Sequence, residues 1–126
     1  MALVAIVIAL ALIEYLVFGM LVGRARVRCN VLAPATTGHP VFERYFRVQQ
    51  NTLEQLVVFV PSMWLFGMYV SPLWAAGLGL LFVIGRVLYL IGYVGDPKTR
   101  GAGFGLSFLP TVILALGALV GAILSL

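Results

Sequence analysis

The stretch FERYFRVQQNTLE, residues 42–54, places four ionised side chains just before an apolar run, LVVFVPSMWLFGMYV, at residues 56–70. A charged side chain at the centre of a membrane helix costs about 2.5 to 3.5 kcal/mol on the insertion scale. Ionisable residues at such depth normally face a protein interior or a water-filled cavity. The stretch therefore predicts a membrane helix whose first half is polar and faces other parts of the protein or a ligand.

The whole chain is strongly apolar. Of its 126 residues, 63% are hydrophobic and 10% are charged, and the mean hydropathy is +1.13. These values exclude an ordinary soluble domain. A helix needs about 20 apolar residues to cross the hydrocarbon core. The candidate spans are residues 2–23, 43–70, 72–94 and 104–126. We expect an all-α integral membrane protein, an antiparallel bundle of four transmembrane helices forming a single domain, residues 1–126.

The net charge of +4 comes from eight basic residues against four acids, and it is unevenly placed. The first connection is flanked by Arg24, Arg26, Arg28, Arg44 and Arg47, and the third contains Lys98 and Arg100. Cytoplasmic loops of membrane proteins are enriched in such residues. We therefore expect both connections on the cytoplasmic side of the membrane, and both termini on the outer side. Because orientation accounts for the basic charge, we expect no nucleic-acid partner.

Cys29 and His39 are each the only residue of their kind. A single cysteine cannot form an intrachain disulfide, and in a cytoplasmic loop its thiol stays reduced. No metal-ligand spacing surrounds His39, and we expect no metal ion. The glycine-rich stretch GDPKTRGAG, residues 95–103, matches neither common nucleotide-binding fingerprint. We expect it only to connect two helices.

Two polar stripes lie on the expected helices. At about 100° per residue, one face of the second helix spans an arc of about 120°. This face contains Glu43, Arg44, Arg47, Gln50, Asn51 and Glu54. Gln49 points to the opposite side. On the third helix, Arg86, Tyr89 and Tyr93 fall within about 60° and near the same end of the bundle. We expect the two stripes to meet in one site.

Two interpretations fit these stripes. In the first, Arg47, Glu54 and Arg86 form an interhelical ion network that fixes the register of the bundle. In the second, the stripes form a cationic pocket for an anionic ligand that carries carboxylates. Cations outnumber acids on the stripes, and Arg26 and Arg100 add to them at the same surface. This excess favours the anion pocket, and the adjoining lipid would supply an apolar co-substrate.

Glu14 lies about halfway through the first span, with no polar residue three or four positions further on. A lone acid at this depth is also the proton-coupled carboxylate expected of a small multidrug transporter. Four helices in a chain of this length fit that architecture too. The transporter is therefore an alternative hypothesis. It leaves the stripes unexplained, because Arg47 and Arg86 would repel a lipophilic cation.

The chain resembles the MAPEG family, the membrane-associated proteins of eicosanoid and glutathione metabolism, over nearly its whole length. Four features carry the resemblance. They are ATTGHP at residues 35–40, FERYFRVQQNTLE at residues 42–54, RVLYLIGY at residues 86–93, and Arg100, seven residues beyond Tyr93. In combination they are specific, and they identify the chain as similar to a prokaryotic-type member.

The resemblance implies a homotrimer of four-helix subunits that binds glutathione, its co-substrate, between neighbouring subunits near the cytoplasmic face. By position, the implied glutathione contacts are Arg47, Asn51 and Glu54 on the second helix and Arg86, Tyr89 and Tyr93 on the third. Arg26 and Gln49 would come from the adjacent subunit, which agrees with the opposite direction of Gln49 on the helical wheel. Arg100 matches the arginine that stabilises the glutathione thiolate.

The activity implied is that of a glutathione-dependent transferase or peroxidase acting on lipophilic electrophiles from the bilayer. A fixed cation beside a thiol lowers its pKa from about 8.5 and so favours the nucleophilic thiolate. A non-catalytic, lipid-binding MAPEG protein is the second hypothesis, and the transporter that uses Glu14 is the third. Gln55 stands where the leukotriene-synthase branch of the family has a tyrosine, which weighs against that branch.

Overall fold

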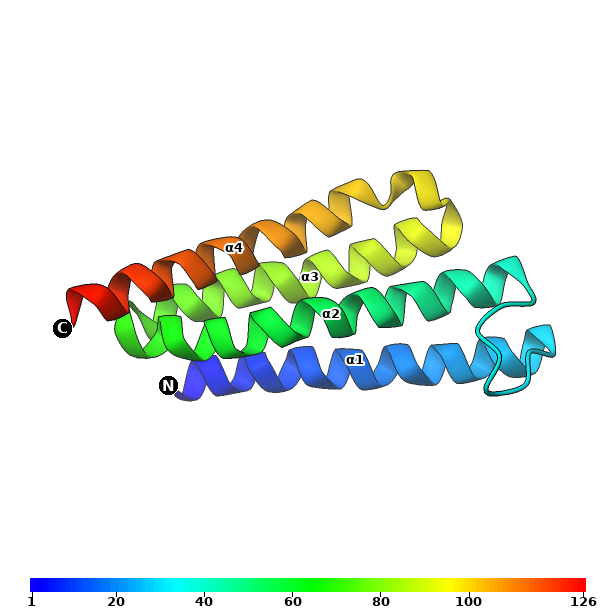
Figure 1. Cartoon of the computed structure of the whole chain (residues 1–126), viewed down its shortest axis with the longest axis horizontal. Coiled ribbons are helices and arrows are strands. Elements are labelled where there is room, and N and C mark those ends of the chain that lie inside the picture. The colour runs from blue at the N-terminus through cyan, green and yellow to red at the C-terminus, as the bar shows by residue number, and fades with distance from the viewer.

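Four long helices packed side by side make up the protein. The structure is a computed structural model that describes residues 1–126. Its elements are α1 (Ala2–Cys29), α2 (Pro40–Tyr69), α3 (Pro72–Gly95), the short 3-10 helix η1 (Pro97–Thr99) and α4 (Gly101–Leu124). Successive long helices run in opposite directions, so both termini and the α2–α3 turn lie at one end (Figure 1). The other end, which we call the loop end, holds η1 and the α1–α2 connection. The expected all-α fold of four helices is confirmed.

Three helical segments are long and apolar enough to cross a membrane: Ala2–Cys29, Pro72–Gly95 and Pro97–Leu124. Large apolar side chains cover the outside of the bundle, as lipid requires. The protein is therefore an integral membrane protein. The expected span at residues 43–70 is not among the three, because the ionised side chains of its first half make α2 too polar. α2 nevertheless runs alongside the other helices for its 30 residues (Figure 1).

α1 extends beyond the end that hydropathy predicts. It continues from residue 23 to Cys29, because arginine is a good helix former and a helix need not stop where the apolar run ends. Its 28 residues correspond to about 42 Å, whereas the hydrocarbon core is about 30 Å thick. Asn30 ends the helix in the left-handed conformation, with φ at 55°. The arginines of the last turns are thus carried at the loop end on a regular helix.

α2 and α4 both begin three residues earlier than expected, at Pro40 and Gly101. Proline is favoured in the first turn of a helix because no amide hydrogen is needed there. His39 precedes α2, and its Nδ1 accepts a hydrogen bond of 3.1 Å from the amide of Val41. The only histidine of the chain therefore caps a helix.

Small residues let the helices approach closely. A Cβ built on Gly85 would lie 2.7 Å from the backbone nitrogen of Ser107, so α3 and α4 cross with their backbones in contact. Gly117 and Gly121 play the same part between α4 and α2. A Cβ on Gly117 would lie 2.5 Å from the ring of Phe66. These two glycines, four residues apart, thus let α4 approach α2 of the same chain closely.

The main apolar core occupies the half of the bundle nearer the termini. At its centre the rings of Phe59 and Phe82 stack with 3.8 Å between their centroids. Val4 and Val7 of α1 and Leu114 of α4 complete the packing around them. Most of the buried polar side chains, including Asn51, Thr52, Arg86 and Ser107, lie in the half nearer the loop end.

Candidate functional site

Arg86 is the centre of a buried polar cluster in the loop half of the bundle. Its side chain is 0% exposed. The guanidinium donates to Asn51 Oδ1 at 2.7 Å, to Thr52 Oγ1 at 3.0 and 3.2 Å, and to Ser107 Oγ at 3.1 Å. It also lies over the ring of Tyr89, 4.3 Å from the ring centroid. One arginine therefore joins α2, α3 and α4.

Arg47 and Glu54 form the only ion pair, with 3.4 Å between Nη1 and Oε1. Both lie on α2 and are half exposed. The first interpretation of the stripes, an ion network of Arg47, Glu54 and Arg86, is not what the structure shows, because Arg86 binds neutral acceptors. Arg86 also offers no surface to a ligand. Its connection to the polar face of α2 is Asn51, whose amide oxygen it binds.

Two tyrosines lead from Arg86 toward the loop end. The ring of Tyr89 is buried, and 5.5 Å separates its centroid from that of the half-buried Tyr93. The guanidinium carbon of Arg100 lies 5.8 Å from the Tyr93 centroid. Arg100 is exposed and donates a hydrogen bond of 3.0 Å to the carbonyl of Pro97 in η1. The turn at η1 thus holds Arg100 beside the tyrosines.

Arg26 of α1 and Gln49 of α2 lie where these two helices face each other. A Cβ built on Gly19 would lie 2.9 Å from Gln49 Nε2, so the side-chain amide of Gln49 packs against α1 at Gly19. Arg26 donates to the carbonyl of Ala35 at 2.7 Å and lies over the ring of Phe42 at 4.7 Å. No hydrogen bond joins either residue to the Arg86 cluster. The expected site residues thus form two groups in one chain: Arg26 and Gln49 in one, and Arg47, Asn51, Glu54, Arg86, Tyr89, Tyr93 and Arg100 in the other.

Positive charge at the loop end is poorly balanced by acids. Arg26, Arg44 and Arg100 donate only to backbone carbonyls. Arg44, for example, donates a hydrogen bond of 3.1 Å to the carbonyl of Val94 at the end of α3. A carbonyl satisfies a hydrogen bond but carries no negative charge. This end of the protein can therefore attract and hold an anion through charge-assisted hydrogen bonds.

Sequence reasoning missed Thr52 and Ser107, whose hydroxyl groups are fully buried (0% exposed) on Arg86. The available signal was a hydroxyl residue within an apolar helix. Such residues usually bond to the backbone of their own helix, and Ser107 Oγ does lie 3.1 Å from the carbonyl of Gly103. A second partner on another helix cannot be predicted from that pattern.

An apolar groove between α2 and α4 begins beside Glu54. Its volume is about 240 Å³. Glu54 and Gln55 form the polar end, and the remaining wall includes Val58, Phe108 and Leu116. The groove lies on the outside of the bundle, where a membrane presents acyl chains. It therefore connects the polar face of α2 with lipid.

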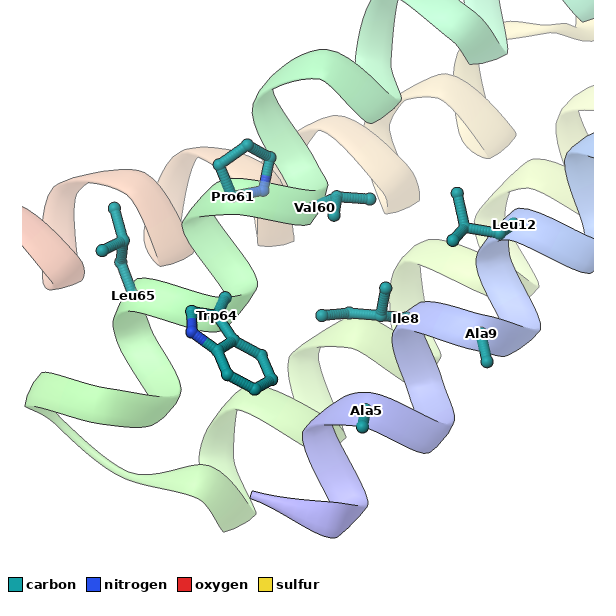
Figure 2. Close-up of a pocket in the computed structure, with 8 residues that line it drawn as sticks. All are labelled: Ala5, Ile8, Ala9, Leu12, Val60, Pro61, Trp64 and Leu65. Carbon is teal, nitrogen blue, oxygen red and sulfur yellow. The ribbon is translucent and has the colours of Figure 1, made fainter.

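A larger hollow, of about 560 Å³, lies between α1 and α2 (Figure 2). Ile8 and Leu12 of α1 point toward Val60 of α2, and Trp64 lies nearer the terminal end. Pro61 also lines the hollow. Its walls are apolar, and it lies in the terminal half, away from the Arg86 cluster. We therefore do not assign the polar ligand to it.

The carboxylate of Glu14 is buried inside the bundle, and neither oxygen has a hydrogen-bond donor. The binding carboxylate of a transporter must be reached by its substrate. Neither oxygen of Glu14 is accessible in this way, so the structure does not favour the transporter hypothesis. No group of three or more His, Cys, Asp and Glu side chains that could hold a metal ion is present.

Comparison with known proteins identifies the family. The sequence matches the model of the MAPEG family over residues 3–120. An uncharacterized protein of Synechocystis sp. is 49% identical over 92% of this chain and 85% of its own length. Microsomal glutathione S-transferase 2 of Homo sapiens is 44% identical over 84% of this chain and 70% of its own. Leukotriene C4 synthase of Cavia porcellus is 36% identical over 79% of this chain and 66% of its own length. The chain therefore belongs to the MAPEG family.

Proposed function

We propose that the protein is a membrane-bound transferase or peroxidase that uses glutathione against lipophilic electrophiles. The observation that carries this proposal is the unbalanced positive charge of Arg26, Arg44 and Arg100 at the loop end. Glutathione is an anion with two carboxylates, and arginine binds carboxylates through two parallel hydrogen bonds. The similarity to microsomal glutathione S-transferase 2 supports the same co-substrate.

The tripeptide would bind along the polar face of α2 and the end of α3. Arg47, Asn51 and Glu54 supply charge and hydrogen bonds, and Tyr93 supplies a phenol beside them. Tyr89 supports Tyr93 from the interior, with their rings 5.5 Å apart. In this arrangement Arg86 serves the site by holding Asn51, since it has no exposed surface.

Glutathione would lie between neighbouring subunits of a homotrimer. Arg26 lies on α1 and Gln49 packs against it, whereas Tyr93 lies near the end of α3 and Arg100 lies between η1 and α4. In the proposed assembly one tripeptide would touch both groups where two copies of the chain meet. The assembly would also explain how α2 can cross the membrane as a fourth helix despite its charges. A neighbouring subunit would shield these charges from lipid.

The loop end would face the cytoplasm, where glutathione is available. Seven of the eight basic residues lie at this end: Arg24, Arg26, Arg28, Arg44, Arg47, Lys98 and Arg100. Basic residues near the ends of membrane helices favour the cytoplasmic side. Both termini would then be periplasmic in a bacterial inner membrane.

Arg100 would stabilise the glutathione thiolate. The thiolate attacks an electrophilic carbon that arrives through the groove beside Glu54, and a sulfur–carbon bond forms. In conjugate addition the resulting carbanion takes up a proton, and in epoxide opening the alkoxide does so. A lipid hydroperoxide would instead be reduced to its alcohol and water, while two glutathione molecules are oxidised to the disulfide. Both reactions need the thiolate, so both depend on a fixed cation near the sulfur.

The test compares Arg100→Ala with Lys98→Ala in protein purified in detergent. Both variants remove an exposed cation from the same connection, but only Arg100 is assigned to the thiolate. Conjugation of glutathione to an activated aryl halide should fall by about tenfold or more in Arg100→Ala, since each pKa unit changes the thiolate fraction about tenfold. The glutathione dissociation constant should change much less. Lys98→Ala should keep the wild-type turnover.

Two results would count against this proposal. Wild-type protein that neither binds glutathione nor conjugates an electrophile would refute the function as a whole. Glutathione binding without turnover of aryl halides, epoxides or hydroperoxides would refute catalysis and identify a non-catalytic MAPEG binder.

A further inference from the structure

Glu14 occupies a core position of α1. The buried residues of α1 include Val4, Val7, Ala11 and Phe18. Glu14 fills the gap between Ala11 and Phe18, at the spacing of three and four residues that places side chains on one face. Its two carboxylate oxygens are buried without a donor. An unpaired carboxyl group inside a membrane protein is costly, so this position requires an explanation.

Glu14 lies at the same level of the bundle as Arg86. α1 and α3 run in the same direction (Figure 1), and they meet where a Cβ on Gly79 would lie 2.7 Å from a methyl group of Val7. Glu14 and Arg86 each follow these contact residues by seven positions. Seven residues turn a helix by about 700°, or nearly two full turns, and advance it by about 10 Å. The two helices therefore present Glu14 and Arg86 toward each other.

Arg86 lacks one acceptor and a balancing charge. A guanidinium group has five N–H donors and stays protonated in proteins. Arg86 makes four hydrogen bonds, all to neutral oxygens of Asn51, Thr52 and Ser107, and the second hydrogen of Nη1 has no acceptor. A buried charge without a counter-ion is strongly destabilising. The unfilled donor and the unfilled oxygens of Glu14 complement each other.

No other acid is available inside the bundle. The chain has four acidic residues: Glu14, Glu43, Glu54 and Asp96. Glu54 pairs with Arg47 on the surface of α2, and both Glu43 and Asp96 are exposed at the loop end. Glu14 is therefore the one carboxylate that can balance the charge of Arg86.

We infer that Glu14 is the counter-ion of Arg86 within each subunit, and that this pair positions Asn51 for glutathione. The negative charge of Glu14 keeps the guanidinium where its Nη2 reaches Asn51 Oδ1 at 2.7 Å. Glu14 is thus a positioning residue that acts through Arg86. The role of Asn51 rests on the proposed function, whereas the charge balance between Glu14 and Arg86, which no direct hydrogen bond joins, is a property of the free protein.

A double-mutant cycle on ligand-free protein in detergent tests the pair. The variants are Glu14→Gln, Arg86→Gln and the double variant, and the measurement is thermal unfolding. Arg86→Gln should lower the melting temperature clearly in the wild type and much less in the Glu14→Gln background, where no carboxylate is left unpaired. Equal decreases in the two backgrounds would overturn the pair. If Glu14→Gln alone does not fold, the double variant should recover folded protein, and its failure to do so would also overturn the pair.

Infrared spectroscopy gives a second, independent readout of the charge. The difference spectrum between wild type and Glu14→Gln should show loss of an ionised carboxylate band. Loss of a protonated carboxyl band instead would contradict the role of counter-ion. Tyr15→Phe, an adjacent change that leaves every acid in place, should remove neither band.

Glutathione affinity tests the positioning of Asn51. Glu14→Gln should raise the dissociation constant by about tenfold, with little change of kcat at saturating glutathione. Glu14→Asp, which keeps the charge, should restore most of the affinity. Unchanged affinity in Glu14→Gln, beside a wild type that binds, would refute the positioning role and leave the proposed function intact. A wild type that does not bind glutathione would refute the proposed function, and the double-mutant cycle would still decide the ion pair.

Discussion

Arg86 is a charged residue buried inside a membrane protein, and residues of three other helices surround it. Asn51 and Thr52 of α2 and Ser107 of α4 accept its hydrogen bonds, and Glu14 of α1 supplies the counter-charge that we infer. A hydrogen bond to a charged group contributes more than one between neutral groups, about 1.5 to 3 kcal/mol. The cluster therefore fixes the register of the helices where the apolar core ends.

Thr52→Val tests this role at the level of one hydroxyl group. The substitution keeps the shape of the side chain but leaves two N–H donors of Arg86 without their acceptor. We expect it to lower the free energy of unfolding by about 1 to 3 kcal/mol, as loss of a buried partner does. The measurement is thermal unfolding in detergent.

Thr111→Val is the matched control for Thr52→Val. The Thr111 hydroxyl is also buried, but its hydrogen bond of 3.0 Å goes to the carbonyl of Ser107 in the same helix. Its loss leaves no donor of Arg86 unpaired, so the effect should be clearly smaller. Equal destabilisation by the two variants would show that the bonds of Thr52 to Arg86 contribute nothing specific.

Part of this cluster could be predicted from the sequence. Helical geometry placed Asn51 and Arg86 on facing stripes, and the structure joins them at 2.7 Å. The same geometry directed Gln49 away from Asn51, and Gln49 does cover α1. The sequence left open whether Glu54 pairs with Arg86, because a helical wheel orders side chains around one helix but does not show which residue of another helix lies at the same depth.

At the scale of the helices, hydropathy predicted four elements and their order, whereas their ends were set by other forces. α1 ends at Asn30, where the backbone turns left-handed, and α2 begins at the cap formed by His39. Such local signals act where the chain leaves the hydrocarbon, and an average over an apolar window does not detect them. The charged half of α2 shows the same limit, since tertiary packing and not hydropathy holds it in the bundle.

Gly103→Ala tests the close crossing of α3 and α4. A Cβ on Gly103 would collide with the backbone of Tyr89, so the two helices would have to separate. The Arg86–Ser107 hydrogen bond, one helical turn away, would lengthen as they do. We expect a melting temperature several degrees lower in detergent, because overpacking of this kind typically costs about 1 to 3 kcal/mol.

Gly105→Ala provides the control on the same helix. A Cβ on Gly105 meets no atom within 4 Å, and alanine is favoured over glycine in a helix by about 1 kcal/mol. This variant should be as stable as the wild type or more so. Destabilisation by both variants to the same extent would contradict the assigned crossing.

At the scale of the whole molecule, the distribution of charge divides the bundle into two ends. The loop end carries every basic residue except Arg86, and the terminal half holds the apolar core. This division could be predicted from the sequence, because it depends only on where charged residues fall between apolar runs. Which surfaces meet in an assembly could not, since that depends on contacts between copies of the chain.

The single cysteine makes the orientation measurable. Cys29 is half-buried at the loop end, so it should react with a membrane-impermeant maleimide in inverted inner-membrane vesicles and remain unlabelled in intact spheroplasts. The Cys29→Ser/Ser71→Cys variant, with its thiol in the α2–α3 turn at the terminal end, should show the opposite pattern. Labelling of Cys29 from outside the spheroplasts would reverse the assigned topology.

The proposed function depends on glutathione binding at the loop end, between copies of this chain. The most direct measurement is an experimental structure of the protein solved in detergent with glutathione added. We expect three subunits, with density for the tripeptide between neighbours. Its carboxylates should lie near Arg47 of one subunit and Arg26 of the next, and its sulfur near Arg100. A single isolated subunit, or tripeptide density away from these arginines in a saturated sample, would contradict it.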